Sequence, residues 1–542
     1  MKYTSRKILF PLVASTLLFS CQQQEKKASQ PNIILILVDD MGYSDISPFG
    51  SEIRTPNLQK LADEGLIMTR FYNAARCCPS RASLLTGLYP HQTGLAAMAD
   101  QRYDIEGYQG YLSDNAATIA ELLKSDSYRT YMTGKWHVGD IPSSVPSARG
   151  FDRTYAFLNG ATSYYNLEPY RDSSWIEITG SIDLTMHLDG KDYVPPDTGF
   201  YTTNAYTDYA IKFIKEDSAL NKPFFLYLSY NAPHWPLHAP EEDIQKYEGK
   251  YMAGWDALRK KRFKMQKELG VIPADTKLSP TDARWLDWNR FTPGEIERYD
   301  RKMAVYAAMI DRMDQNIGKL LNYLEETHQL SNTLIIFLSD NGGDRSDEIA
   351  FTDNYDKSGP IGSERSFTGY GPGWANTSNT PFREAKARTF FGGIASPFIA
   401  WYPSYINSGD VVDFQGHIND IMPTILDYAS VDYPHEYNGN ELPPLPGRSL
   451  RSIWEGDHEQ RIGPLFFEHF GNRAVIDGEW KLVSLANENW ELYDVINDPV
   501  ELNNLVDSLP EKALELEELY ENWADSLNVL PLDKHEEHKL KR

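Results

Sequence analysis

Ile33-Ile34-Leu35-Ile36-Leu37-Val38-Asp39-Asp40 is the stretch on which the fold of this 542-residue chain depends. An unbroken run of isoleucine, leucine and valine predicts a strand that is buried on both faces, as in a parallel sheet covered by helices. Two aspartates follow where the strand ends. Because ligands of open α/β sheets bind beyond the carboxyl ends of the strands, Asp39 and Asp40 indicate a metal or anion site.

Three later stretches show the same pattern, in which an apolar run is followed by residues that can act as acids, bases, cations or metal ligands. The strand predicted over residues 128–133 precedes Lys135 and His137. The strand over 223–230 precedes His234, and the strand over 334–338 precedes Asp340 and Asn341. Because the carboxyl ends of parallel strands meet at one edge of a sheet, we expect these side chains to share a crevice. The pattern predicts an α/β fold with a large, mostly parallel sheet.

The oxygen-bearing members of this set predict a metal site. Asp39, Asp40, Asp340 and Asn341 would present oxygen ligands alone, which suit Ca²⁺, with Mg²⁺ as the alternative, better than zinc. Taken one at a time, each is more often the cap of a turn, so the metal prediction depends on their coming together.

A second stretch, Cys77-Cys78-Pro79-Ser80-Arg81-Ala82-Ser83-Leu84-Leu85-Thr86-Gly87, predicts a helix that begins near its thiols. Proline is tolerated in a first helical turn, where its missing N–H is not needed. A group at Cys77 would then lie at a helix N-terminus, which favours anions. The alternative is a buried structural cysteine.

This string resembles the signature of type I sulfatases, in which the first cysteine is oxidised to formylglycine. The resemblance covers about residues 32–505 and is closest to the arylsulfatase-like branch, through residues 231–237 and 370–376. It implies an alkaline-phosphatase-like α/β/α sandwich, a calcium ion and a formylglycine-generating or sulfatase-maturating enzyme as partner. Phe391 departs from the pattern, since many relatives carry glutamate before Gly392-Gly393.

The resemblance also implies roles for individual residues. The calcium ligands that it implies are Asp39, Asp40, Cys77, Asp340 and Asn341. The catalytic groups that it implies are Cys77, Arg81, Lys135, His137, His234 and Lys386. The lysines would bind sulfate, His234 would protonate the leaving oxygen, and His137 would accept a proton. His238 and His469 are further candidates for substrate contact, with a structural role as the alternative. Cys78 stands at a variable position and is predicted to be inert.

The implied activity is that of a sulfuric ester hydrolase, which removes sulfate from a sulfated carbohydrate and also from aryl sulfates. One alternative is a phosphatase or phosphodiesterase of the same superfamily, which usually carries threonine or serine as nucleophile and binds two metals. Another is an inactive glycan-binding surface lipoprotein. Cys77 disfavours the first alternative, and the intact lysines and histidines disfavour the second.

The net charge of the chain limits the classes of molecule that it is expected to bind. The formal net charge is −24, which argues against nucleic acid, because phosphate backbones bind basic surfaces. A sulfate ester must therefore meet a local positive pocket. An aromatic stretch over residues 163–170, with Tyr164, Tyr165 and Tyr170, is predicted to stack on a sugar, with ordinary loop packing as the alternative.

The N-terminus predicts export. Lys2, Arg6 and Lys7 precede an apolar run over residues 8–20, which is shorter than the roughly 20 residues of a membrane span. Leu18-Phe19-Ser20-Cys21 resembles a bacterial lipobox with Cys21 as the lipidated residue, and plain signal cleavage is the alternative. We expect a periplasmic or outer-membrane-anchored lipoprotein of a Gram-negative bacterium, held to the membrane only by its lipid.

The predicted organisation has four parts: a signal peptide over residues 1–21, a polar linker over 22–30, a catalytic domain over 31–455 and a C-terminal subdomain over 456–542. The last part alternates strand-like runs and turns and ends in an acidic helix over residues 509–527. It predicts a small antiparallel sheet with one covering helix. The charged segment from residue 533 is predicted to fray. After lipidation of Cys21 only two adjacent thiols remain, so no disulfide framework is expected.

Overall fold

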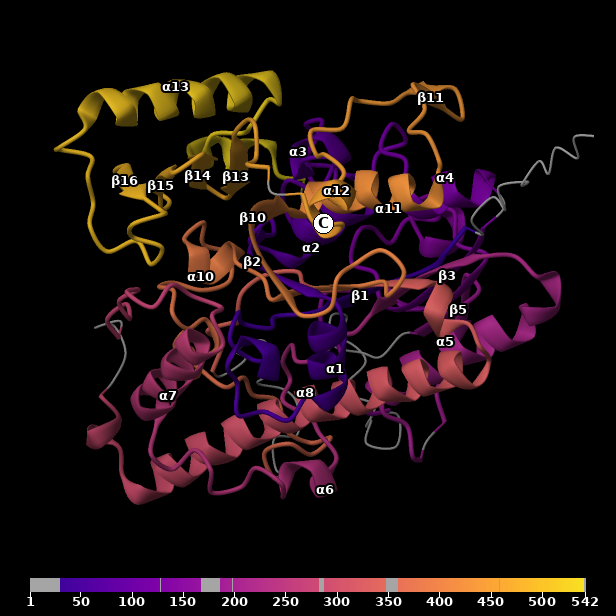
Figure 1. Ribbon diagram of the computed structural model, residues 1–542, viewed down its shortest axis with the longest axis horizontal. Helices are drawn as coiled ribbons and strands as arrows, with labels where there is room; N and C mark the ends of the chain where they lie inside the picture. Colours follow the sequence, from indigo (N-terminus) through magenta and orange to yellow (C-terminus); the bar gives the residue numbers. More distant parts are fainter. Residues whose placement is uncertain are drawn as a thin grey trace, which may run out of the picture.

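The computed structural model describes residues 30–126, 128–166, 186–196, 198–281, 287–347, 359–457 and 459–540. Its main body is a ten-stranded mixed sheet with helices on both faces, and a smaller antiparallel sheet covered by one helix lies beside it (Figure 1). The predicted α/β fold with a C-terminal α+β subdomain is confirmed. The signal peptide, the linker and Cys21 lie outside the described residues.

The large sheet has the strand order β10-β2-β9-β8-β1-β7-β3-β4-β5-β6. Its strands are β1 (Asn32–Val38), β2 (Leu66–Tyr72), β3 (Arg129–Lys135), β4 (Arg153–Phe157), β5 (Met186–Leu188), β6 (Lys191–Tyr193), β7 (Phe224–Ser229), β8 (Thr333–Ser339), β9 (Phe398–Trp401) and β10 (Asp410–His417).

The register of the central strands brings their carboxyl ends to one edge. β1 pairs in parallel with β7 and with β8, so that Leu37 lies opposite Ser229 and Val38 opposite Ser339. β3 pairs in parallel with the other side of β7, where Gly134 also lies opposite Ser229. Every loop that follows β1, β3, β7 and β8 therefore leaves the sheet at the same edge.

Alternation along β1 explains why the sheet is covered on both sides. Ile34, Ile36 and Val38 face one buried cluster with α1 (Pro56–Glu64), α5 (Thr202–Glu216) and α8 (Pro293–Glu326). The residues between them face a second cluster with α2 (Cys77–Thr86), α4 (Ile119–Ser125), α11 (Ile421–Ala429) and α12 (Arg451–Trp454). Figure 1 shows these two sets of helices on opposite faces of the sheet.

Short elements complete the main body. They are α3 (Pro90–Thr93), α6 (Glu241–Ile244), α7 (Trp255–Glu268), α9 (Pro372–Ser378), α10 (Phe391–Ile394), β11 (Glu436–Tyr437) and β12 (Asn440–Glu441).

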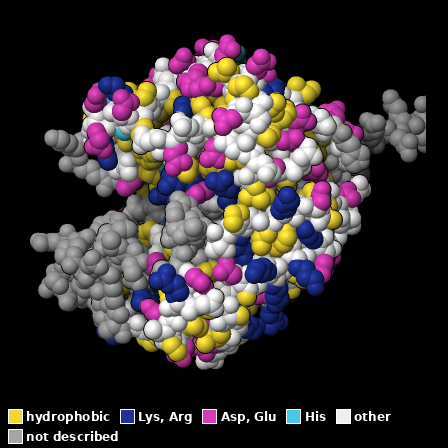
Figure 2. Space-filling view, turned by 90° about the vertical axis from the view of Figure 1, so that its left-hand side faces the viewer, with side chains coloured by type: hydrophobic (Ala, Val, Ile, Leu, Met, Phe, Trp, Pro, Cys, Tyr) yellow, Lys and Arg dark blue, Asp and Glu magenta, His cyan; other side chains and the backbone are white. Residues whose placement is uncertain are grey.

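The C-terminal subdomain is a four-stranded antiparallel sheet, β13 (Leu465–His469), β14 (Asn472–Asp477), β15 (Trp480–Ser484) and β16 (Glu491–Asp494), covered by α13 (Pro510–Ser526). Val475, Leu482 and Leu492 pack against Leu516 of the helix, which gives this sheet its own small core. Acidic side chains gather over this upper part of the face in Figure 2, whereas lysine and arginine gather toward the bottom.

The segment after α13, which includes α14 (His535–His538), does not fray as predicted. Leu540 N–H donates to Arg102 O at 2.8 Å, and Asp104 N–H donates to His538 O at 3.1 Å. His535 packs edge-on against Tyr103. The charged composition suggested a solvated end, but these aromatic contacts fix the segment to the main body. None of the helices in the described ranges has both the length and the apolar character needed to cross a membrane.

Candidate active site

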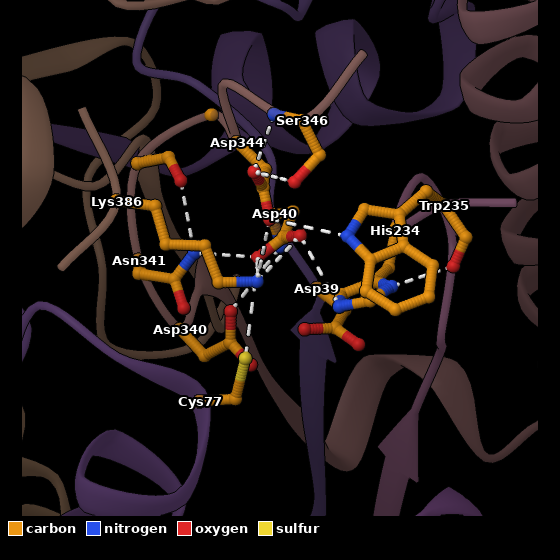
Figure 3. A network of polar contacts seen from close by, with 12 residues as sticks. Asp39, Asp40, Cys77, His234, Trp235, Asp340, Asn341, Asp344, Ser346 and Lys386 are labelled. Atoms are coloured by element: carbon orange, nitrogen blue, oxygen red, sulfur yellow. Dashed lines mark hydrogen bonds and ion pairs between the residues drawn. The ribbon is translucent and has the colours of Figure 1, made fainter. Parts of the chain in front are cut away.

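The loops at this edge of the sheet bring together most of the residues singled out from the sequence (Figure 3). Asp39 and Asp40 follow β1, and Asp340 and Asn341 follow β8. Lys135 ends β3, and His234 lies five residues beyond the end of β7. Asp40 and His137 both have left-handed backbone, with φ of 65° and 57°, at the points where their strands turn into loops.

The floor of the site is a buried array of alternating charges. Lys135 Nζ donates to Asp39 Oδ2 at 2.5 Å, with both side chains fully buried. Arg81, on the second turn of α2, forms an ion pair with Asp340 at 2.8 Å and donates to Lys135 O at 2.9 Å. These contacts tie the helix of the cysteine motif to β1, β3 and β8.

Asp40 is the residue on which the other side chains converge. Lys386 Nζ lies 2.7 Å from its Oδ1, and Asn341 Nδ2 donates to the same oxygen at 2.7 Å. His234 Nε2 lies 3.4 Å from Oδ2, and Cys77 Sγ lies 4.0 Å from Oδ1. Figure 3 shows these groups around the carboxylate.

The same carboxylates fit a cation. Asp39 Oδ1 and Asn341 Oδ1 are buried and accept no hydrogen bond from the described residues, so two oxygen ligands have unused lone pairs. Burial, reinforced by the charge of Asp39, raises the pKa of Asp340 to about 7, although Arg81 and Lys135 act in the opposite direction. Asp39, Asp40, Cys77 and His234 also have ligand atoms within 4.8 Å of one another.

Cys77 is the first residue of α2 and is 2% exposed. Burial raises the pKa of its thiol well above the ordinary value, although Lys135 and Lys386 act in the opposite direction. The residue is therefore a neutral thiol near neutral pH. An unmodified thiol is a weak nucleophile because the thiolate is the reactive form.

Asp344, which the sequence did not single out, and Cys78, for which no role was predicted, also contact residues of the site. Asp344 lies 3.1 Å from Lys386 Nζ, and it accepts hydrogen bonds from Ser346 N–H and Trp235 Nε1–H. It follows the Asp340-Asn341-Gly342-Gly343 turn, so continuation of that motif was the available signal. Cys78, predicted to be inert, lies 3.1 Å from Nε2 of His137.

The structure does not bring His238 or His469 to the pocket wall. His238 is fully buried; its Nε2 donates to Ser366 O at 2.6 Å, and its Nδ1 accepts from Tyr164 N–H at 3.4 Å. His469 is buried in the small domain, close enough to Arg76 for the charge of that arginine to act on it. Both histidines therefore have the structural role that was the alternative to substrate contact.

The described tyrosines of the aromatic stretch over residues 163–170 also have the alternative role, which was ordinary loop packing. Tyr164 is fully buried and donates to Asn231 O at 2.6 Å and His234 O at 2.8 Å, so it shapes the histidine loop. Tyr165 packs against Tyr201. Tyr170 lies outside the described residues.

A pocket of about 920 Å³ opens above these groups. Its lining includes Cys77, His137, His234 and Lys386 from the site. The remaining polar residues of the wall are Arg76, Asp100, Gln101, Arg102, Asp140, Asn159, Asp344 and Ser346. The wall thus offers many donors and acceptors around a cationic and carboxylate floor, an arrangement suited to a polar ester.

The chain belongs to the sulfatase family, whose sequence model matches residues 31–431. A second model, described as N-sulphoglucosamine sulphohydrolase, C-terminal, matches residues 388–524. The protein is therefore a sulfatase with the alkaline-phosphatase-like fold of that family.

Individual relatives agree with this assignment. An uncharacterised sulfatase of Schizosaccharomyces pombe is 37% identical over 539 residues, which cover 93% of this chain and 94% of the relative. The arylsulfatase of Klebsiella aerogenes is 36% identical over 457 residues, covering 82% and 95%. The human N-acetylgalactosamine-6-sulfatase is 30% identical over 428 residues, covering 77% and 65%.

Among solved structures, Ps i-CgsB in complex with k-i-k-neocarrahexaose aligns with a TM-score of 0.68 and 26% identity. The alignment covers 92% of this chain and 93% of that chain, so the likeness extends through both the main body and the small subdomain.

Proposed function

We propose that this sulfatase hydrolyses the sulfate ester of a sulfated carbohydrate, with formylglycine formed from Cys77 as nucleophile and a calcium ion in the carboxylate site. The observation that carries the proposal is the convergence of Cys77, His137, His234 and Lys386 on one polar pocket, with Lys135 paired to Asp39 at its floor. The names of the human relative and of the ligand in the solved structure support a sugar substrate.

Stabilisation of negative charge is the main task of the site. A sulfate monoester reacts through a transition state whose charge is spread over the sulfate oxygens, so cations that are already in place lower the barrier most. Lys135 and Lys386 are held by Asp39 and Asp40 with their ammonium groups near Cys77. They would supply the positive charge that the sulfate oxygens need.

Oxidation of Cys77 removes the weakness of its neutral thiol. As formylglycine, residue 77 would supply a hydrated aldehyde: one hydroxyl would displace the ester oxygen, protonated by His234, from sulfur, and loss of the proton from the other hydroxyl would release the sulfate and restore the aldehyde. Arg81, on the same helix, is ion-paired with Asp340 and so fixes this end of α2 against the site.

The two histidines have environments that suit opposite proton transfers. Burial lowers the pKa of both. At His234 the nearby Asp40 offsets part of this effect, so its pKa falls less than that of His137 and it is the easier of the two rings to protonate, as the acid for the leaving oxygen must be. At His137 the charges of Lys135 and Arg81 add to the effect of burial, which favours the neutral ring that a base needs.

The metal site fits the same scheme. Asp39, Asp40, Asp340 and Asn341 would hold Ca²⁺, which, when bound, polarises oxygens as a Lewis acid. Asp39 is ready to bind a cation, because Lys135 and the neighbouring cations overcome the effect of burial and hold its pKa well below its usual value.

A screen on defined sulfated mono- and oligosaccharides tests this function. We expect sulfate release from at least one sulfated sugar, loss of that release in Cys77→Ala, and a formylglycine mass at residue 77 in the peptide from the native host. Turnover of phosphate esters by Cys77→Ser at full rate would instead favour the phosphatase alternative. An unmodified thiol with glycan binding but no release would favour the binding module.

We also propose that the protein is exported and lipidated at Cys21, on the basis of its N-terminal sequence. Mass spectrometry of the mature N-terminus tests this. A diacylglyceryl-modified Cys21 supports the lipoprotein, whereas an N-terminus without lipid supports plain signal cleavage.

A further inference from the structure

Arg76 is a cation of the pocket whose side chain has no hydrogen-bond or ion-pair partner among the residues that the structure describes. It immediately precedes Cys77, has extended backbone with φ −149° and ψ 152°, and lines the pocket with Cys77, Asp344 and Lys386. The residue is half-buried, and its Nε is buried without a hydrogen-bond acceptor. Across the described ranges, its guanidinium forms neither a hydrogen bond nor an ion pair within 4.0 Å.

The other cations of the site and its wall are all paired. The pairs are Lys135 with Asp39 at 2.5 Å, Arg81 with Asp340 at 2.8 Å, Lys386 with Asp40 at 2.7 Å and Arg102 with Asp140 at 2.5 Å. A guanidinium that is removed from water costs free energy unless an acceptor compensates it. Arg76 alone in this set lacks that acceptor.

The neighbours of Arg76 do not supply the missing charge. Asp344 and Asp40 act on it electrostatically from beyond ion-pair distance, and both carboxylates already bind Lys386. His469 is the neighbour toward the small domain. Burial, reinforced by the charge of Arg76, holds the pKa of His469 well below its ordinary value, so its ring is neutral near neutral pH.

Arg76 lies farther from the floor than the lysine at the end of β3. Lys135 is fully buried and is not part of the pocket wall, whereas Arg76 is half-buried and lines that wall beside Met98, Ala99 and Asp100. A sulfate held by Lys135 and Lys386 would therefore leave Arg76 facing the part of the substrate next to the ester. A planar guanidinium binds the two oxygens of an oxyanion through two parallel hydrogen bonds. The hydroxyl groups of a sugar fit this geometry less well and carry no negative charge.

We infer that Arg76 binds a second anionic group of the substrate, a carboxylate or a further sulfate close to the ester that is cleaved. The inference rests on the proposed function, since it places the scissile sulfate at the two lysines. It narrows the substrate class to doubly anionic saccharides, such as a sulfated sugar joined to a uronate or a disulfated sugar.

The test uses substrate pairs that share one scissile sulfate and differ only in the second anion. One pair is a sulfated disaccharide with a free uronate and its methyl ester; the other is a disulfated sugar and its monosulfated form. We expect wild-type enzyme to prefer the doubly anionic member of at least one pair. Arg76→Gln should reduce that preference about tenfold or more, as loss of a charge-assisted hydrogen bond does, and Arg76→Lys should reduce it less.

Arg102→Gln is the matched control, because it removes a positive charge from the same wall that is already paired with Asp140. The preference ratio should stay within about threefold of wild type in this variant. An equal loss of activity on all substrates in Arg76→Gln would place Arg76 at the scissile sulfate, and unchanged activity on all substrates would exclude the contact. Either result overturns the inference, and the pair that responds identifies the anion.

Binding provides a readout that does not depend on turnover. In the Cys77→Ala background, calorimetry with the doubly anionic sugar should show affinity that falls about tenfold on adding Arg76→Gln. Absence of sulfate release from every sugar would contradict the proposed function, whereas unchanged affinity in the double variant would contradict the role of Arg76 alone.

Discussion

The Sγ atom of Cys78 lies 3.1 Å from Nε2 of His137, so the second cysteine of the motif contacts a histidine that faces the reaction centre. The same sulfur accepts the N–H of Ala99 at 3.2 Å. Burial raises the pKa of Cys78 to about 12, so the thiol stays neutral, and its sulfur can accept a hydrogen bond from Nε2–H of the ring, which leaves Nδ1 of His137 free to accept a proton. This contact would fix the ring's orientation and tautomer.

Replacing Cys78 should therefore impair catalysis without abolishing it. We expect Cys78→Ala to lower kcat on an aryl sulfate by up to about tenfold, the effect of one lost hydrogen bond, and Cys78→Ser to retain most of the activity. The fraction of residue 77 that is oxidised must be measured by mass spectrometry for each variant. Equal kcat in wild type and Cys78→Ala, at equal oxidation, would show that the contact has no catalytic effect.

Metal affinity should rise with pH across about pH 7. Asp340 must lose its proton to bind a cation, and burial together with Asp39 raises its pKa to about 7 in the metal-free site. Calcium titration followed by calorimetry at about pH 5.5 and pH 8 checks this, with tighter binding expected at the higher value.

The same ion should stabilise the fold. Chelation should lower Tm, since a ligand at about 100 times its Kd contributes roughly 2.7 kcal/mol. Asp39→Asn should remove the response to calcium, whereas Asp63→Asn, at an exposed position of α1, should keep it. A chelation response that survives in Asp39→Asn would move the ion to another site.

His238 should make the protein less stable in acid. Burial lowers its pKa to about 4, while an unfolded chain has the ordinary value near 6.5, so the unfolded state binds the extra proton between these values. Its contribution is present above pH 6.5 and is lost as the pH falls toward 4, at up to about 3 kcal/mol. Urea unfolding of wild type and His238→Gln across this range should show a shallower pH dependence in the variant; parallel curves would contradict the assignment.

A buried ion pair should hold the small subdomain to the lysine loop. Lys481 lies 2.6 Å from Glu501, both are fully buried, and Glu501 also accepts the N–H of Phe391, five residues after Lys386. Lys481→Ala should cost about 3–5 kcal/mol in the free energy of unfolding, because it leaves Glu501 buried without its cation. The double variant Lys481→Met/Glu501→Gln should lose less; a larger loss would show that the pair itself is strongly favourable.

The central strands and the metal-binding edge could be predicted because their signals are local. An apolar run such as residues 33–38 indicates a doubly buried strand, and an aspartate directly after it has little freedom to lie elsewhere. Knowledge of the sulfatase pattern was needed for Lys386, which reaches the site from a loop that no periodicity identifies.

Contacts made by loops could not be predicted in the same way. For Tyr164 the sequence left sugar stacking and ordinary loop packing open, whereas in the structure its hydroxyl binds the backbone around His234. Cys78 and Arg76 flank the predicted nucleophile, but their contacts depend on how residues 97–102 and His469 pack around α2. The segment after residue 530 was misjudged for a related reason, since its aromatic partners lie more than four hundred positions earlier in the chain.

The burial of Cys77 has a consequence for biosynthesis. Once the sheet has closed, the thiol lies 2% exposed beneath a pocket whose walls come from segments as distant as Met98 and Leu540. If residue 77 is oxidised to formylglycine, as we propose, the enzyme that oxidises it would need access to a side chain that the finished fold buries. The proposal therefore predicts that oxidation precedes folding and that a molecule that folds first keeps its thiol.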